Sequence, residues 1–369
     1  MNKTDILITI GIAAYNCQRF IGEALKSALQ QSHQNLEILI YNDASTDNTQ
    51  SILNSYNDPR IRVIQGLHNQ GVAHARQTIK QQAKGEYLTW LDSDDVFDTK
   101  RLSILLECAE TKSYDLVIDS YNIIDEKGQR QALTKKIPSH LSADANFTRL
   151  FERNFMPAHP LINKNCFRNV DYDLSLRTSE DYDYWLKCSL AGFTFKHLDQ
   201  LLMNYRITSG SLSSDPLASR EATYKILNKY KVTHLLAVYQ SRNIDQATQH
   251  YMACMQHIFR KEFCLALKYA KHPWPIEPDN DLDFYRGSLY LALNQVKTAT
   301  QHLKAHLNKY PDSVAGLNNF GLAQKKLGLP AQAYWQQALD IFPNYQDAQR
   351  NLQDQDSITL SQIQCERLR

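Results

Sequence analysis

The chain has few of the features expected of a secreted or membrane-spanning protein. Its 369 residues include only seven cysteines, and no two are spaced as C-x-x-C. That pattern fits neither a disulfide framework nor a zinc knuckle, and it favours a reducing compartment. No apolar run approaches the ~20 residues that span a bilayer. The apolar stretch at 6–12 is also too short and wrongly flanked for a signal peptide, so we expect a cytoplasmic protein.

The chain also lacks an excess of charge of either sign, because its net charge is only +2. This balance argues against bulk binding to nucleic acid or to a membrane surface. Two nucleotide-binding motifs are missing as well. Residues 11–15 do not supply the G-x-G-x-x-G turn of a dehydrogenase, and no P-loop is present. Length and an apolar fraction of 43% instead favour two globular domains with a sizeable core.

The first 120 residues alternate between short apolar runs and apolar residues at helical spacing. We expect strands at 6–12, 37–41, 61–64, 86–91 and 114–121, and helices at 20–29, from 47, at 72–83 and at 102–109. Ser45 or Thr46 is available to cap the helix that starts near Asp47. The alternation predicts an α/β domain with a mostly parallel sheet. Ligands should then bind in the loops after the first, second and fourth strands.

From about Ala222 the strand patterns end and a helical repeat begins. Gly287 and Gly321 are 34 residues apart, and each is followed by an alanine-led helical pattern and a proline. This arrangement is typical of tetratricopeptide repeats, with a fainter unit at 251–269. An unrelated helical bundle with the same alanine and leucine pattern is the alternative. Residues from Asp347 onward are expected to form a solvated capping helix and a frayed tail.

Acidic side chains follow two of the expected strands. The loop L-D-S-D-D places Asp92, Asp94 and Asp95 within four residues, where their charges repel one another. Mg²⁺ or Mn²⁺ prefers such oxygen ligands and often shares them with phosphates. The alternative is an acidic cap for the following helix. Asp43, at the end of the second strand, can accept a hydrogen bond from a nucleotide base, although turn chemistry explains it equally well.

Taken together, these segments resemble the family 2 glycosyltransferases, which have the GT-A fold and inverting chemistry. Six motifs occur in the order typical of the family: I-T-I-G-I-A-A-Y-N at 8–16, N-D-A-S-T-D at 42–47, N-Q-G-V-A-H-A-R at 69–76, G-E-Y-L with L-D-S-D-D at 85–95, S-E-D-Y-D-Y-W at 179–185, and Y-R with G-S-L-S at 205–213. The six motifs are spread over about 215 residues of the chain, and any one of them alone would be weak evidence for the family.

The resemblance implies a role for each matched residue. Asp43 would contact the nucleotide base, with backbone near Ala13 and Tyr15 beside it, and Arg76 would help to hold the nucleotide. The metal, Mn²⁺ or Mg²⁺, and the donor would be held by Asp92 and Asp94, with Asp94 the stronger metal ligand. Asp181 would be the catalytic base that takes the proton of the acceptor.

Physical chemistry is consistent with that last role, because Glu180 beside Asp181 can raise the pKa of the base by like charge. The alternative is an exposed helix start, where acids are favoured anyway. Two positions depart from the family pattern. Ala13 stands where a proline is usual, and Thr208 stands where a histidine is frequent, which leaves the third protein ligand of the metal open.

We therefore expect a GT-A domain at 1–215, a helical linker at 216–245 and a tetratricopeptide-like all-α domain at 246–369. The enzyme would transfer a sugar from a nucleotide-sugar, most commonly a UDP-sugar in this family, with guanosine and thymidine donors open. The acceptor would be a glycan, a lipid carrier or a protein, and residues 127–160 would shape its side of the site. The helical tail would bind acceptor or form a dimer. The alternative is a non-catalytic nucleotide-binding adaptor that acts through its tail.

Overall fold

The computed structural model describes residues 3–135, 145–146, 148–151, 154–208, 216–274 and 281–360. Within it the chain forms two compact units, Met1–Ile226 and Leu227–Arg369. The G-S-L-S segment at 210–213 and parts of the expected acceptor region at 127–160 lie outside the described residues. In the part of the chain that is described, no helix is long and apolar enough to cross a bilayer.

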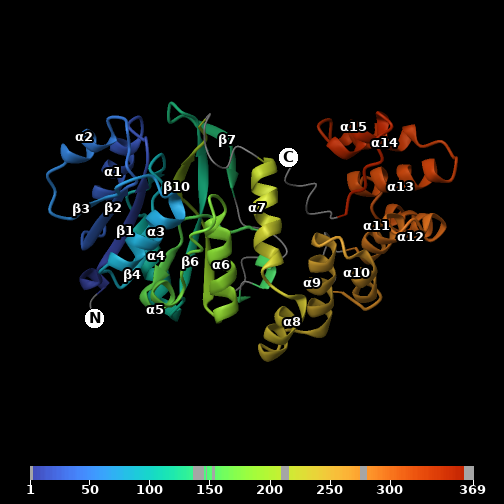
Figure 1. Ribbon diagram of the computed structural model, residues 1–369, viewed down its shortest axis with the longest axis horizontal. Helices are drawn as coiled ribbons and strands as arrows, with labels where there is room; N and C mark the ends of the chain where they lie inside the picture. Colours follow the sequence, from blue (N-terminus) through green and yellow to red (C-terminus); the bar gives the residue numbers. More distant parts are fainter. Residues whose placement is uncertain are drawn as a thin grey trace. The chain divides into compact units, whose positions relative to one another are not determined.

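The first unit is built on a sheet whose N-terminal half is parallel (Figure 1). Its strands lie in the order β3-β2-β1-β4: β3 (Ile61–Gln65), β2 (Leu36–Asn42), β1 (Ile8–Ala14) and β4 (Tyr87–Trp90). The helices between them are α1 (Ile21–Leu29), α2 (Thr49–Asn54), α3 (Val72–Gln82) and, after β4, α4 (Arg101–Lys112). Strands β2 and β4 are buried at every position, as expected for a parallel sheet covered on both faces. The predicted α/β class is confirmed.

The C-terminal half of the sheet is mixed. Strand β9 (Leu161–Asn163) lies between β4 and β6 (Leu116–Ile124) and is antiparallel to both. Strand β10 (Thr194–Arg206) then pairs with β6 in parallel. Shorter antiparallel partners complete the edge: β5 (Val96–Phe97), β7 (Arg130–Lys135) and β8 (Ala145–Asn146). The helices of this half are α5 (Lys164–Asn169), α6 (Glu180–Ala191) and α7 (Pro216–Asn228).

The expected helix cap near position 46 is wrong. Helix α2 begins at Thr49 with Asn48 as its N-cap residue, and the Asn48 side chain makes no cap hydrogen bond. Ser45 and Thr46 instead contact the preceding loop, since Ser45 Oγ accepts a hydrogen bond from the backbone N–H of Asn16 at 3.0 Å. These hydroxyls therefore tie the loop after β2 to the loop after β1.

The second unit is helical throughout its described part. Helices α8 (Val232–Ser241), α9 (Gln246–Phe259), α10 (Phe263–Ala270), α11 (Leu282–Ala292), α12 (Val296–Lys309), α13 (Val314–Lys326), α14 (Gln332–Ile341) and α15 (Gln346–Leu352) follow one another. The two repeat glycines sit where helices pack closely. A Cβ on Gly287 would lie 2.6 Å from the side chain of Leu303, and one on Gly321 would lie 2.7 Å from that of Trp335.

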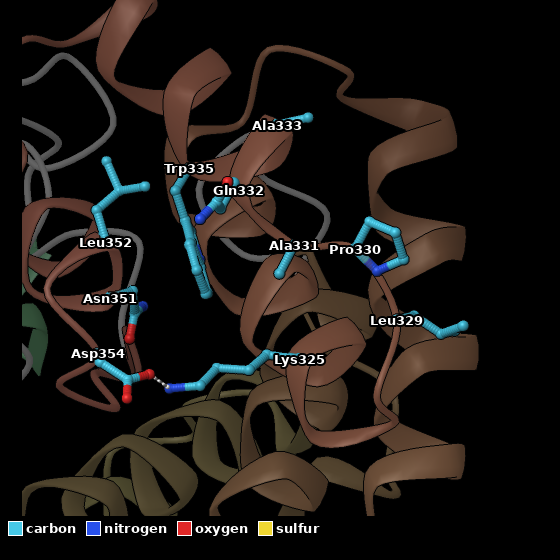
Figure 2. A pocket seen from close by; sticks show the side chains of 10 residues that line it. All are labelled: Lys325, Leu329, Pro330, Ala331, Gln332, Ala333, Trp335, Asn351, Leu352 and Asp354. Atoms are coloured by element: carbon cyan, nitrogen blue, oxygen red, sulfur yellow. Dashed lines mark ion pairs between the residues drawn. The ribbon is translucent and has the colours of Figure 1, made fainter.

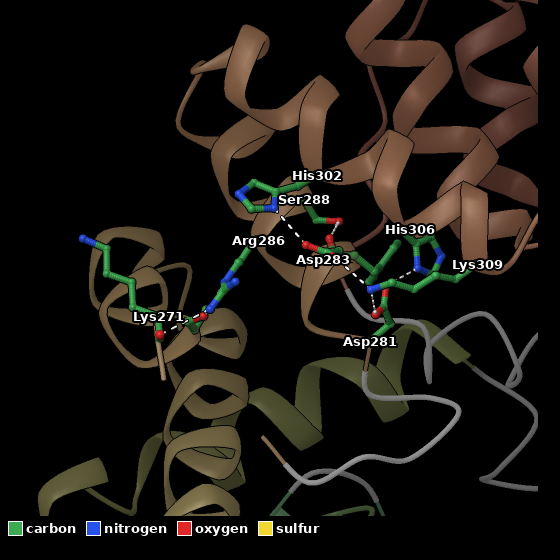
Figure 3. A network of polar contacts seen from close by, with 10 residues as sticks. Lys271, Asp281, Asp283, Arg286, Ser288, His302, His306 and Lys309 are labelled. Carbon is green, nitrogen blue, oxygen red and sulfur yellow. Dashed lines mark hydrogen bonds and ion pairs between the residues drawn. The ribbon is translucent and has the colours of Figure 1, made fainter. Parts of the chain in front are cut away.

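Polar contacts fasten α11 to α12 (Figure 3). His306 is fully buried, and its Nδ1 lies 2.5 Å from Asp281 Oδ2 while its Nε2 lies 2.8 Å from Ser313 Oγ. Lys309 Nζ donates to Asp283 at 2.7 Å and to Asp281 at 3.3 Å. The start of α11 is thus held by charges on the last turns of α12.

The stretch after α15 differs from the solvated tail expected from the sequence. Thr359 is only 3% exposed, and its backbone is hydrogen-bonded to α13. Asn318 and Asn319 of α13 are fully buried beneath this stretch. The chain composition around 353–360 is polar, which suggested exposure, but these polar groups are satisfied inside the helical unit.

Candidate active site

The loops after β1 and β2 form one end of the sheet. Asn16 adopts a left-handed backbone with φ of 47°, and its Oδ1 accepts a hydrogen bond from the backbone N–H of Thr46 at 2.8 Å. Asp47 Oδ2 accepts another from the backbone N–H of Gln18 at 3.1 Å. These contacts fix the turn that follows Ala13 and the end of β1, and they leave Tyr15 48% exposed there.

Asp43 lies directly after β2 and is 3% exposed. Its two carboxylate oxygens accept hydrogen bonds from the backbone N–H groups of Gln70 at 2.9 Å and Gly71 at 2.8 Å. Gly71 has φ of 91° and precedes α3, so Asp43 holds the start of that helix in place. Each oxygen retains a lone pair, because a carboxylate oxygen can accept two hydrogen bonds.

Arg76 of α3 joins two segments that are far apart in the sequence. Its guanidinium donates to Asp92 Oδ1 at 2.8 Å and to Glu180 Oε1 at 2.7 Å. The arginine is 4% exposed, and the side chain of Glu180 is 7% exposed, while that of Asp92 is 35% exposed. Although burial opposes its charge, the two carboxylates raise the pKa of Arg76, so it stays a cation.

The acidic loop after β4 is held from behind by Arg206, at the end of β10. The guanidinium Nε of Arg206 donates to the backbone carbonyl of Asp94 at 2.8 Å, and its backbone N–H donates to Asp95 Oδ1 at 2.8 Å. Another guanidinium nitrogen donates to Glu23 Oε2 at 2.6 Å. Asp95 is fully buried by these contacts, so it supports the loop, whereas Asp92 and Asp94 are only partly buried.

The electrostatics of this loop favour a cation. Burial and the neighbouring charge of Asp92 raise the pKa of Asp94 to about 6. Burial, with Asp92 and Asp94 beside it, also raises the pKa of Asp95. Among the described residues, Asp95 Oδ2 is buried without a hydrogen bond. A positive charge at this loop would relieve the repulsion among the three carboxylates.

Asp181 lies in the first turn of α6, next to the residue bound by Arg76. Ser179 precedes the helix with a left-handed backbone, φ of 57°, which turns the chain sharply at this point. Burial raises the pKa of Asp181, Arg76 opposes the rise, and Asp92 adds to it. Burial raises the pKa of Glu180 to about 7 despite its pairing with Arg76. The carboxyl groups are thus biased towards holding a proton, mainly by burial and not by like charge alone.

The structure therefore brings four of the expected site residues into one electrostatic group: Arg76, Asp92, Asp94 and Asp181. Asp43 is connected to it through the start of α3. The sequence does not predict that Arg76 and Arg206 each bind two separate segments of the chain, nor that His159 is buried. That histidine is 3% exposed, and within the described structure neither of its ring nitrogens has a hydrogen bond. Its ring lies 5.6 Å from that of Tyr121.

Comparisons with known proteins point to a single enzyme family. The model of "Glycosyl transferase family 2" matches residues 9–173. The chain is 31% identical over 209 residues to the UDP-Glc:alpha-D-GlcNAc-diphosphoundecaprenol beta-1,3-glucosyltransferase WfaP of Escherichia coli, covering 57% of this chain and 80% of that protein. It is 27% identical to the putative teichuronic acid biosynthesis glycosyltransferase TuaG of Bacillus subtilis, covering 64% of this chain and 93% of that protein.

A solved structure extends the likeness to both units. Residues 1–349 of S. aureus TarS in complex with UDP-GlcNAc match with a TM-score of 0.56 at 15% identity, covering 95% of this chain and 93% of that one. At that identity the match concerns the fold: a GT-A sheet domain followed by a helical region. The family match, the relatives and the arrangement of carboxylates at the sheet edge lead to one conclusion: this chain belongs to glycosyl transferase family 2 and is a nucleotide-sugar glycosyltransferase.

Proposed function

We propose that the chain is a metal-dependent, inverting hexosyltransferase that uses a UDP-sugar donor. One observation carries this proposal: Arg76 binds Asp92 at 2.8 Å and Glu180 at 2.7 Å, which places the acidic loop beside the first turn of α6. A donor held at that loop would present its anomeric carbon near Asp181. The named activity of WfaP and the UDP-GlcNAc complex of TarS support a UDP-sugar.

The nucleotide would bind at the loops after β1 and β2. Backbone groups near Ala13, the exposed ring of Tyr15 and the free lone pairs of Asp43 are the available contacts for a base. Arg76 already pairs with two carboxylates, so it would act on the nucleotide by keeping Asp92 in position. The base of the nucleotide and the diphosphate of the donor would then be held by different groups of residues.

Mn²⁺ or Mg²⁺ fits Asp94 and Asp92 as its protein ligands. Within the described residues no group of three or more His, Cys, Asp or Glu side chains is placed to hold a metal ion. Mg²⁺ commonly needs only one or two carboxylates, and phosphates and waters complete its shell. The raised pKa of Asp94 and the unpaired Oδ2 of Asp95 show a loop with excess negative charge. A cation held by these residues would supply charge stabilisation for the diphosphate leaving group.

Asp181 would be the general base. Its carboxylate would accept the proton of an acceptor hydroxyl as that oxygen attacks the anomeric carbon from the face opposite the diphosphate, which inverts the centre. Burial raises its pKa, so it is a stronger base than an exposed aspartate. Asp181 Oδ1 already accepts a hydrogen bond from the backbone N–H of Tyr182 at 2.7 Å, which orients the group.

The acceptor would be a glycan, a lipid carrier or a protein, and the reaction would take place in the cytoplasm. We assign catalysis to residues 1–215, a linker role to 216–245 and tetratricopeptide-like packing to 246–369, where the helical tail binds acceptor or a second copy of the chain. Nothing in the comparisons supports the alternative of a non-catalytic adaptor.

Isothermal titration with UDP and GDP, each with Mn²⁺ and with EDTA, tests the proposal. We expect UDP to bind with Mn²⁺ and to lose most of its affinity in EDTA or in an Asp94→Ala variant. A Glu107→Ala variant serves as the control, because Glu107 is exposed on α4. Binding of neither nucleotide under any condition would overturn the proposed donor site. Binding that EDTA leaves unchanged would overturn its metal dependence.

A further inference from the structure

Residues 356–360 lie against α13 and α15 and form no regular secondary structure. Ser357 and Thr359 each engage a buried asparagine through both their backbone N–H and their backbone C=O. Residues i and i+2 of an extended chain direct these groups to the same side. One side of the segment is therefore bound in the way that a neighbouring strand would bind it.

The asparagines supply one donor and one acceptor each. Asn319 Nδ2 donates to the carbonyl of Thr359 at 2.6 Å, and its Oδ1 accepts from the N–H of the same residue at 2.8 Å. Asn351 Nδ2 donates to the carbonyl of Ser357 at 2.8 Å, and its Oδ1 accepts from that N–H at 2.7 Å. Asn318 adds a bond to the same carbonyl at 3.1 Å. These contacts recognise backbone and leave side-chain identity to other groups.

The hydroxyl groups of the segment are recognised separately. Asp347 Oδ1 accepts from Ser357 Oγ at 2.5 Å, and its Oδ2 accepts from Thr359 Oγ1 at 2.8 Å. The hydroxyl of Tyr345 also contacts that of Thr359. The carboxylate of Asp347 therefore binds the hydroxyl groups of two residues with one residue between them. Hydrogen bonds to the backbone alone would not require a hydroxyl group at either position.

An acidic residue precedes this pair. Asp356 forms ion pairs with Lys325 at 2.8 Å and with Lys326 at 2.9 Å. Lys325 and Asn351 also line a pocket of about 660 Å³ that Trp335 borders, and the ion pair between Lys325 and Asp354 is seen there (Figure 2). Open volume thus adjoins the bound segment on the side of α14 and α15.

We propose that this groove is a binding site for an extended peptide of the form acidic residue, Ser or Thr, any residue, Ser or Thr, and that residues 356–359 occupy it as a tethered mimic. Backbone-directed clamps can accept another chain, because the atoms they bind are common to all peptides. This deepens the role proposed for the helical tail and rests on that part of the proposed function. It does not depend on sugar transfer.

Because the segment belongs to the same chain, it competes strongly with free peptides for the site. A segment joined to its site by a short linker has an effective concentration in the millimolar range. A free peptide of equal intrinsic affinity therefore competes poorly until the segment is released. The test must weaken the tethered segment while leaving the groove intact.

A Thr359→Pro variant does this. Proline has no N–H for Asn319 and no hydroxyl for Asp347, while it and the residue before it tolerate an extended backbone. The probe is a fluorescein-labelled peptide of residues 354–360. Its binding to the whole 369-residue chain is measured by fluorescence anisotropy. We expect this variant to bind the probe at least about tenfold more tightly than the unaltered chain, since several hydrogen bonds no longer compete. The matched control Thr359→Ser keeps both groups and should bind as weakly as the unaltered chain.

Adding Asn319→Ala to Thr359→Pro should abolish the gain, and so should a probe with alanine at both hydroxyl positions. If Thr359→Pro lowers helix content by circular dichroism, a chain ending at Gln355 replaces it in the same titration. Equal probe binding by the released and unaltered chains, or binding indifferent to Asn319→Ala, would overturn the proposal. UDP titration of the same variants reports on the first unit, so failure of the peptide site and failure of the donor site give different results.

Discussion

Replacing Arg76 by methionine should expose the cost of the buried carboxylate that it neutralises. Arg76 is 4% exposed and binds Glu180 at 2.7 Å, where the glutamate side chain is 7% exposed. Removing one partner of a buried ion pair costs about 3–5 kcal/mol, because the other charge is left without compensation. Asp92, at 35% exposed, is largely hydrated and should add little. We therefore expect Arg76→Met to lower the free energy of unfolding by about 3–5 kcal/mol at pH 8.

The loss should depend on pH with a definite sign. Burial raises the pKa of Glu180 to about 7, above its ordinary value of 4.5, so the folded protein binds this proton more readily than the unfolded chain. Stability then falls as pH rises through that interval. Without Arg76 the pKa rises further, and the destabilisation should be larger at pH 8 than at pH 5. Urea unfolding at both pH values measures it.

A double variant and a control make the reasoning refutable. Arg76→Met combined with Glu180→Gln removes both charges of this pair and should regain most of the stability at pH 8, while sugar transfer stays low. As the control, Arg19→Met removes a pair with Glu126 at 2.7 Å in which the two side chains are 60% and 33% exposed, and should cost about 1 kcal/mol or less. A loss below about 1 kcal/mol in Arg76→Met, or no recovery with Glu180→Gln, would show that Arg76 does not compensate Glu180.

Three further outcomes are expected. Asp181→Asn should lower the transfer rate about 10²–10⁴-fold, as loss of a general base does, with UDP affinity by titration unchanged; comparable transfer would remove Asp181 from the mechanism. Gly321→Ala should destabilise the helical unit by about 1–3 kcal/mol in urea, because its Cβ would lie 2.7 Å from Trp335 Nε1, and a neutral effect would contradict that close packing. Burial opposes ionisation of Asp281, yet the hydrogen bond from His306 lowers its pKa below the unfolded value of about 3.8. The ionised group therefore stabilises the folded protein above pH 3.8, and this stability is lost as the pH falls below that value. Acid unfolding that is unchanged in His306→Phe would refute this linkage.

The sequence predicts those parts of the site that follow directly from a buried strand. The apolar runs that become β1, β2 and β4 place Tyr15, Asp43 and Asp92 at one edge of the sheet, because parallel strands end on the same side. Local pattern suffices for these residues. Their assigned roles remain predictions until the donor is titrated.

Contacts between distant segments cannot be predicted in this way. Arg76 and Glu180 are 104 positions apart, and nothing in the periodicity of either helix indicates that they meet. Strand β9 has only three residues, too few to show alternation, although it reverses the direction of the sheet between β4 and β6. The packing of residues 356–360, among which Thr359 is buried, cannot be predicted for a related reason. The polarity of this segment suggests solvent, while its partners are asparagines inside α13.

The position of Arg206 at the end of β10 has a consequence for how the enzyme matures. Strands β3, β2, β1 and β4 all come from the first 90 residues, whereas β10 begins at Thr194 and pairs in parallel with β6. Since Arg206 holds the carbonyl of Asp94 and the carboxylate of Asp95, the acidic loop acquires its final shape only when β10 docks. A chain still being synthesised therefore has the proposed nucleotide-binding edge before its acidic loop takes its final shape.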